Sequence, residues 1–203
     1  MKKLSKFTMI ILMCGISHHT YAKDYPVVDF VNSDYKLDNK LLPKWARIVD
    51  SGELNAGFSL FKKTPKFEDL LTVQRAANRF EYRNDSDNYN VGDYWATPHE
   101  VDIAFGGDCE DIAIWKYAML KRMGWAAEDM TMWAVGINNR KKNGSTLQHV
   151  ILMVELDGKE YLLDSPMAWD DKVVPEPEEV TPEYMNAKFT FNYKFNENGW
   201  DVK

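Results

Sequence analysis

The sequence predicts a single α+β domain in which N-terminal helices pack on an antiparallel sheet. Up to residue 125, apolar residues recur at the three- and four-residue steps of helices, whereas short alternating or continuous apolar runs follow residue 130, as in strands. A chain of 203 residues, 45% of them hydrophobic, can form one domain with a core, and no repeat or low-complexity linker divides it. Helices followed by strands are typical of the α+β class.

Residues 1–22 have the pattern of a secretory signal peptide. Three lysines precede a short apolar run, and Ala22 supplies the small residue expected at a cleavage site. The run is too short to anchor the chain in a bilayer, so we expect residues 23–203 to form one exported, periplasmic domain without a membrane span. Lipidation at Cys14 is the alternative, but Met13 is a poor residue before a lipidated cysteine.

Signal cleavage changes both the charge and the reactive side chains of the chain. Three lysines and no acid are removed, so the formal net charge falls from −6 to −9. Such a surface disfavours nucleic acid and anionic lipid as partners and is compatible with divalent cations. One cysteine, Cys109, and two histidines, His99 and His149, remain. A lone cysteine is buried and inert, paired between chains, or reactive, and these residues are too few for a CxxC redox site or a Cys/His zinc site.

Two helices are expected in the first part of the domain. The first covers residues 41–49 and ends before Gly52. The second begins with Thr64 as N-cap and Pro65 at the first helical position. A loop rich in Asn and Asp follows at 83–92. Its aspartates could bind calcium, but the regular spacing of an EF-hand is missing, so a solvated turn is the favoured interpretation.

Two further helices surround the cysteine. A capping box at Thr97 and Glu100 predicts a short helix through Phe105, with His99 on its exposed first turn. Cys109 starts the next helix, where unpaired backbone N–H groups and the positive end of the helix dipole favour the thiolate of a nucleophile. Apolar residues on more than one face indicate that this helix is buried: Ile112, Ala113, Trp115, Tyr117, Met119, Leu120 and Met123.

The second part of the chain is predicted to form a sheet of four strands. A polar turn at 138–145 and an acidic surface loop at 175–182 are expected to connect strands of this sheet. The strands are residues 131–137, 148–156, 159–164 and 189–195, the last of which closes the sheet.

The dipeptide Asp157-Gly158 predicts a two-residue hairpin turn that brings two candidate catalytic residues together. In this register His149 and Asp164 are diagonal neighbours on one face, about 7 Å apart between backbones. A four-residue loop is the alternative, because the two-residue turn sets Glu155 against Glu160, but any even loop length keeps the shared face. A Cys–His pair needs such an acceptor to orient the imidazole. Each residue alone is more often structural, but together with Cys109 they favour catalysis.

A resemblance to a known family rests on two segments, DYWATPHEVDIAFGGDCEDIAIWKYAMLKRMGW (93–125) and HVILMVELDGKEYLLDSP (149–166). They resemble the bacterial transglutaminase-like cysteine proteases, the periplasmic LapG-type enzymes that clip large surface adhesins. The resemblance implies a papain-like, transglutaminase-like fold. It also implies that Cys109 is the nucleophile, His149 the general base and acid, and Asp164 the orienting group.

The resemblance further implies a calcium ion bound by the carboxylates that flank the cysteine, here Asp108 and Glu110. Hard oxygen ligands suit calcium, although two carboxylates fall short of the six to eight oxygens it takes. The structural alternatives are an N-cap for Asp108 and a dipole-stabilising acid for Glu110. Asp111 fits the role of a first-turn acid better than that of a ligand.

The leading hypothesis is therefore a periplasmic, calcium-dependent cysteine endopeptidase acting on an exported protein. The resemblance implies an adhesin-type substrate, a membrane-bound regulatory partner and a role in biofilms. One alternative keeps the nucleophile Cys109 but transfers the acyl group to an amine, as a transglutaminase does. The other is a catalytically silent module that makes calcium-dependent binding contacts.

Overall fold

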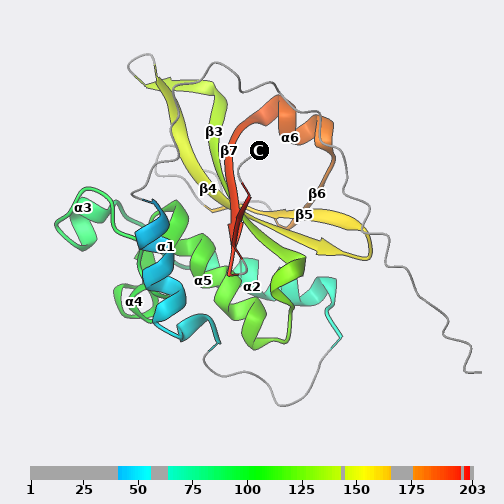
Figure 1. The fold of residues 1–203 in the computed structure, drawn as a ribbon, viewed down its shortest axis with the longest axis horizontal. Helices are drawn as coiled ribbons and strands as arrows, with labels where there is room; N and C mark the ends of the chain where they lie inside the picture. The colour runs from blue at the N-terminus through cyan, green and yellow to red at the C-terminus, as the bar shows by residue number, and fades with distance from the viewer. Residues whose placement is uncertain (1–40, 56–63, 143–144, 166–175, 198, 202–203) are drawn as a thin grey trace, which may run out of the picture. The chain divides into compact units, whose positions relative to one another are not determined.

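Helices come first and a six-stranded antiparallel sheet follows in the computed structural model (Figure 1). The structure describes residues 41–55, 64–142, 145–165, 176–197 and 199–201. The predicted signal peptide, 1–22, lies outside this range. None of the helices described is long and apolar enough to cross a membrane. The α+β class expected from the sequence is confirmed.

The helices lie mostly in the first two thirds of the chain. They are α1 (Leu41–Asp50), η1 (Glu53–Asn55), α2 (Phe67–Ala77), α3 (Asp85–Asn88), α4 (Pro98–Ala104), α5 (Cys109–Arg122), η2 (Ala127–Asp129) and α6 (Pro182–Lys188). Two short strands pair in parallel, β1 (Glu81–Tyr82) with β2 (Gly106–Gly107). The main sheet has the order β6-β5-β4-β3-β7-β8. Its strands are β3 (Met130–Lys142), β4 (Ser145–Leu156), β5 (Lys159–Leu163), β6 (Glu178–Val180), β7 (Phe189–Asn196) and β8 (Gly199–Asp201).

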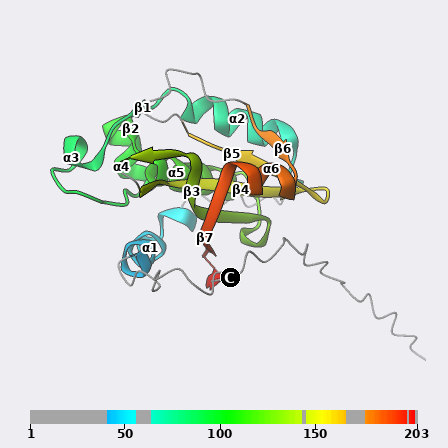
Figure 2. The same cartoon turned by 90° about the horizontal axis from the view of Figure 1, so that it is seen from above.

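Helix α5 forms the centre of the core. It contacts β4 of the sheet as well as α2, α4 and η1. Helices α1 and α2 lie on opposite sides of it in both views (Figures 1 and 2). The side chains of Ile112, Tyr117 and Leu120 are fully buried, as the apolar pattern on several faces predicts. This position fixes the first turn of α5, with Cys109, against β4.

The start of α2 differs from the prediction. Thr64 and Pro65 precede the helix, which begins at Phe67 with Lys66 as N-cap. The carboxylate of Asp69 accepts a hydrogen bond from the Lys66 backbone N–H at 3.2 Å. The contact between Lys66 and Asp69 thus sets the start of the helix, two residues after Pro65.

The sheet is larger than the sequence indicates. The predicted turn at 138–145 is mostly strand, because β3 and β4 pair through it with a register shift between Ile137 and Lys141. Cross-strand hydrogen bonds thus outweigh its polar composition. The predicted surface loop at 175–182 contains β6, which pairs with β5, and the start of α6. The predicted last strand is β7, but β8 pairs with it and ends the sheet.

The hairpin between β4 and β5 has the predicted register. Leu156 faces Lys159 across a two-residue turn, and Asp157 and Gly158 both have positive φ, 52° and 74°. This backbone matches a type I′ turn, which suits the twist of the strands. The four-residue alternative is wrong.

The pairing of β1 with β2 brings two distant segments next to the start of α5. A Cβ atom on Gly106 would lie 2.2 Å from the Glu81 carbonyl oxygen, and one on Gly107 would lie 2.6 Å from Cβ of Asp111. Only glycine permits such close approach. Helix α4 ends with Phe105 in the left-handed conformation, and the two glycines then let residues 81–82 pair with the chain just before the cysteine.

Candidate active site

Cys109 occupies the first position of α5 and is 8% exposed. Its thiol donates a hydrogen bond to Oε2 of Glu110 at 3.0 Å. Helix α5 packs against β4, and the backbone of Val150, the residue after His149, lies close enough to the sulfur to favour its ionised form. The helix start and the hairpin therefore meet in space.

His149 and Asp164 make the contact that the hairpin register predicts. Nε2 of His149 lies 2.6 Å from Oδ1 of Asp164. The same oxygen accepts a hydrogen bond from the Ser165 backbone N–H at 2.7 Å. Burial favours a raised pKa for Asp164, but the charge and hydrogen bond of His149 outweigh it, and the pKa lies below its usual value.

The contact with Asp164 determines which nitrogen of His149 is free to act as a base. An ionised carboxylate is only an acceptor, so Nε2 carries the proton. The other nitrogen, Nδ1, is buried and has no hydrogen-bond partner among the described residues. In the neutral imidazole Nδ1 therefore holds a lone pair that can accept a proton.

Two buried side chains donate hydrogen bonds to the backbone at Asp164. Nε2 of Gln74 in α2 donates to the Asp164 carbonyl oxygen at 2.9 Å. Nζ of Lys116 in α5 donates to the same oxygen and to that of Leu163. Lys116 is fully buried, and burial lowers its pKa to about 7 against the opposing charge of Asp164. Sequence reasoning connected neither side chain with Asp164, although a lysine within the apolar run 112–120 was a usable signal.

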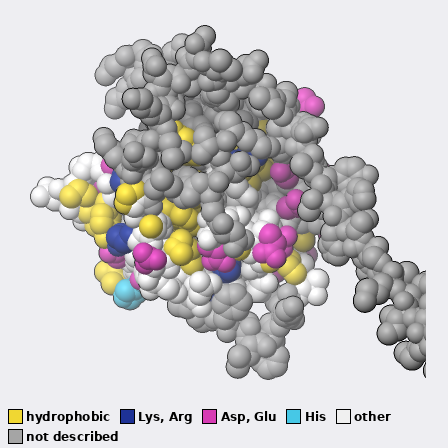
Figure 3. Space-filling view, viewed as in Figure 1, with side chains coloured by type: hydrophobic (Ala, Val, Ile, Leu, Met, Phe, Trp, Pro, Cys, Tyr) yellow, Lys and Arg dark blue, Asp and Glu magenta, His cyan; other side chains and the backbone are white. Residues whose placement is uncertain are grey.

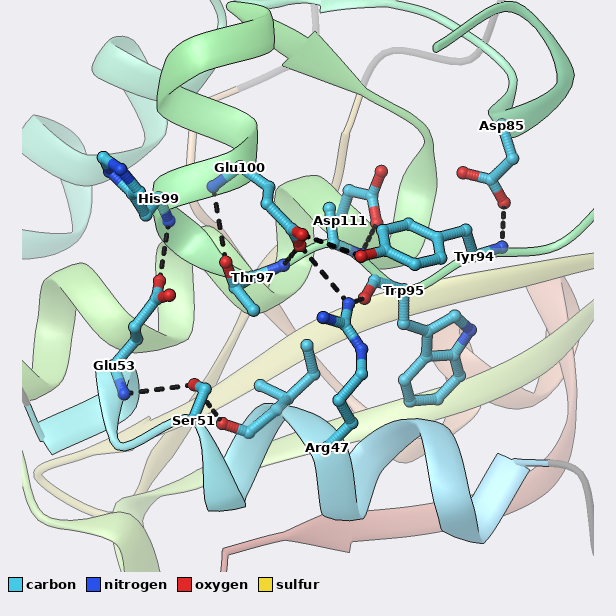
Figure 4. Close-up of polar contacts among 12 residues, drawn as sticks. Arg47, Ser51, Glu53, Asp85, Tyr94, Trp95, Thr97, His99, Glu100 and Asp111 are labelled. Atoms are coloured by element: carbon cyan, nitrogen blue, oxygen red, sulfur yellow. Dashed lines mark hydrogen bonds and ion pairs between the residues drawn. The ribbon is translucent and has the colours of Figure 1, made fainter. Parts of the chain in front are cut away.

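A cluster of acids lies on the other side of the cysteine. Ligand oxygens of Asp85, Asp108 and Asp111 lie within 4.8 Å of one another, and the same holds for Asp85, Asp93 and Glu110. Backbone N–H groups bind one oxygen of Asp85 and one of Asp111 (Figure 4). The second oxygen of each, and Oδ1 of Asp108, are buried without a hydrogen-bond partner among the residues described.

The geometry of this cluster corrects two expectations. The loop at 83–92 is not simply a solvated turn, because it contains α3 and its Asp85 is only 3% exposed. Asp111 is fully buried and belongs to the cluster instead of acting only as a first-turn acid. Asp108 does occupy the N-cap position of α5, but its side chain makes no capping hydrogen bond. On the face shown in Figure 3, acidic side chains lie scattered among apolar and basic ones.

Burial and mutual repulsion make these acids hard to ionise together. Burial is the main cause and raises the pKa of Asp108 to about 10, of Asp111 to about 8 and of Glu110 to about 7. Burial and the charges of Glu110 and Asp108 also raise the pKa of the Cys109 thiol well above its usual value. The helix dipole favours the thiolate, but burial and the neighbouring carboxylates favour the neutral thiol and oppose it.

The comparisons with known proteins agree with this geometry. Residues 54–175 match the model of the bacterial transglutaminase-like cysteine proteinases, BTLCP. The chain belongs to this family. It is therefore a cysteine peptidase with a transglutaminase-like fold. No curated protein matches the chain.

Solved structures similar to this cysteine peptidase include LapG of Legionella pneumophila. A calcium-bound LapG is 25% identical over 80% of this chain and 78% of that chain, with a TM-score of 0.51. A second LapG structure has the same identity and coverage with a TM-score of 0.53. An EGTA-treated LapG is 25% identical over 81% of this chain and 76% of that chain, with a TM-score of 0.51.

One more residue of this cysteine peptidase lies beside the thiol. The side chain of Tyr82 in β1 lies close enough to Cys109 for the two to raise each other's cost of ionisation. Burial is the main cause that raises its pKa, and the charges of Cys109 and Asp108 add to it. The hydroxyl of Tyr82 therefore stays neutral near the sulfur. No sequence signal pointed to it, because only the β1–β2 pairing brings it there.

Proposed function

We propose that this protein is a periplasmic, calcium-dependent cysteine endopeptidase with Cys109, His149 and Asp164 as its catalytic triad. The observation that carries the proposal is the arrangement of the imidazole. Asp164 holds Nε2, Nδ1 is buried and unpartnered among the described residues, and the backbone of the next residue along β4 lies close to the Cys109 sulfur. A nucleophile, a base and an orienting acid are the parts that thiol acyl chemistry needs.

The proposed reaction has two stages. In the first, Nδ1 of His149 takes the thiol proton while Sγ of Cys109 attacks the peptide carbonyl carbon. The tetrahedral intermediate breaks its C–N bond as Nδ1 returns the proton to the leaving amine, and a thioester remains. In the second, water attacks the thioester and gives its proton to His149. The C–S bond then breaks as His149 returns this proton to the sulfur, which restores the thiol, and the released carboxylic acid loses its proton to solvent.

Calcium is the proposed occupant of the acidic cluster. The buried, unpartnered oxygens of Asp85, Asp108 and Asp111 fit a hard cation, and Glu110 and Asp93 can add further ligands. The calcium-bound and EGTA-treated LapG structures support the choice of metal. When bound, the ion would supply positive charge beside Cys109 and fix the first turn of α5.

The proposed substrate is an exported, adhesin-type surface protein, and a membrane-bound protein is the proposed regulator. Both follow from the resemblance of residues 93–125 and 149–166 to LapG-type enzymes and from the signal-peptide pattern of residues 1–22. A protein substrate itself follows from membership of a peptidase family. The proposed biological role is release of adhesins in biofilms.

The proposal is tested with cells that express only the Cys109→Ala form, in which uncut surface proteins should accumulate. Purified native enzyme with calcium should cut a surface protein that accumulates in these cells, and the fragments should together exceed the substrate by the mass of one water. EGTA should stop the reaction and excess calcium should restore it. Cleavage that continues in EGTA would refute the calcium requirement. An amine joined to the new carboxyl end would show acyl transfer instead of hydrolysis.

A further inference from the structure

The segment Tyr94–Thr97 lies between two of the proposed calcium ligands and contacts both through its backbone (Figure 4). The Tyr94 N–H donates to Oδ2 of Asp85 at 2.6 Å. The Ala96 N–H donates to Oδ1 of Asp111 at 2.6 Å. Each carboxylate thus has one oxygen tied to the segment, and its other oxygen is buried without a hydrogen-bond partner in the described part of the chain.

Glu100 in α4 holds this segment at both ends. Its Oε1 accepts from the Tyr94 hydroxyl at 2.7 Å, and its Oε2 accepts from the Thr97 N–H at 2.7 Å. The Thr97 contact belongs to the capping box of α4 and needs no other explanation. The Tyr94 contact does not belong to that motif, because Tyr94 lies outside the helix cap.

Arg47 in α1 holds the middle of the segment. It donates to Oε2 of Glu100 at 3.3 Å and to the carbonyl oxygen of Trp95. Its guanidinium carbon lies 4.5 Å from the centroid of the Tyr94 ring. Trp95 and Ala96 are themselves buried, so the segment is packed from the core side as well. Arg47 also precedes residues 54–175, the region that matches the family model.

We propose that Arg47 and Glu100 are positioning residues of the calcium site. They fix the position of Tyr94–Thr97. The N–H groups of this segment each bind one oxygen of Asp85 or Asp111 and so orient the other, unpartnered oxygen toward a common ion. This inference rests on the proposed function, since it assumes that the acidic cluster binds calcium. Mutation of a group that orients metal ligands without touching the metal typically weakens metal binding 10- to 100-fold.

Calorimetric titration of calcium alone into the mature protein tests this role. Glu100→Gln replaces the acceptor at Thr97 or Tyr94 with an amide donor and removes the charge opposite Arg47. Arg47→Met keeps most of the side-chain length but no donor. We expect each to weaken calcium binding about tenfold or more. Glu176→Gln, which breaks the exposed Arg75–Glu176 pair, is the matched control and should leave the affinity unchanged.

A second variant separates positioning from folding. Tyr94→Phe keeps the ring under Arg47, the backbone N–H and the capping box, and removes only the hydroxyl contact with Glu100. It should weaken calcium binding by a smaller factor, while the thermal midpoint without calcium changes little. Folded Glu100→Gln and Tyr94→Phe proteins with native calcium affinity would overturn the inference. A native protein that binds no calcium would instead refute the proposed function.

Discussion

Cys109→Ala is expected to abolish peptide cleavage and leave the fold intact. Residues 23–203 contain no other thiol, so no side chain there can replace the nucleophile. In serine proteases, loss of the nucleophile lowers kcat by about 10⁶-fold, and a similar loss is expected here. Cys109 is small and alanine favours helices, so its replacement should cost only about 1 kcal/mol of stability. The measurement is kcat/KM on a purified substrate together with the thermal midpoint.

The control for Cys109→Ala is calcium binding by the same protein. The unpartnered oxygens of Asp85, Asp108 and Asp111 do not depend on the sulfur, so calcium affinity should stay close to that of the native enzyme. Cleavage by the alanine variant at more than a trace of the native rate would exclude thiol catalysis. Loss of both cleavage and calcium binding would point to a disturbed site.

His149→Ala is expected to lower kcat by about 10⁴- to 10⁶-fold, because it removes the base that takes the thiol proton. It also removes the imidazole that contacts Asp164 at 2.6 Å and leaves that carboxylate oxygen with only the Ser165 N–H, and loss of a hydrogen bond to a charged group costs about 1–3 kcal/mol. Activity and stability would then fall together. The measurements are kcat/KM and the free energy of unfolding.

His149→Gln separates these two effects. A glutamine amide can donate a hydrogen bond to Asp164, but it cannot accept and return a proton at neutral pH. The free energy of unfolding should therefore recover relative to His149→Ala, while kcat stays equally low. A glutamine variant with substantial activity would show that His149 only supports the structure.

The parts of the site predicted from sequence depend on local rules. The Asp157-Gly158 turn determines the register of one hairpin, and the two-residue period of strands then puts His149 and Asp164 on one face. The position of Cys109 at a helix start follows from the glycines before it and the apolar pattern after it. Each of these inferences uses residues within about 20 positions of one another.

The parts that could not be predicted depend on contacts between distant segments. Asp85 reaches Asp111 because β1 pairs with β2 and because Tyr94 and Ala96 bind the two carboxylates. The 83–92 loop offers aspartates that could bind calcium, but nothing in their spacing indicates which of them is buried. Lys116 likewise supports Asp164 across 48 residues. Such pairings require the tertiary fold.

Alkylation of the native enzyme by iodoacetamide tests the central claim, that Cys109 is the catalytic nucleophile, most directly. Aliquots taken during the reaction would be assayed for cleavage, and the alkylated fraction of Cys109 would be measured by peptide mass mapping. Because residues 23–203 contain a single cysteine, each alkyl group on a protein of this range can be assigned. The account predicts that lost activity equals the alkylated fraction of Cys109 throughout, and that bound substrate slows both. Full cleavage activity after complete alkylation of Cys109 would contradict it.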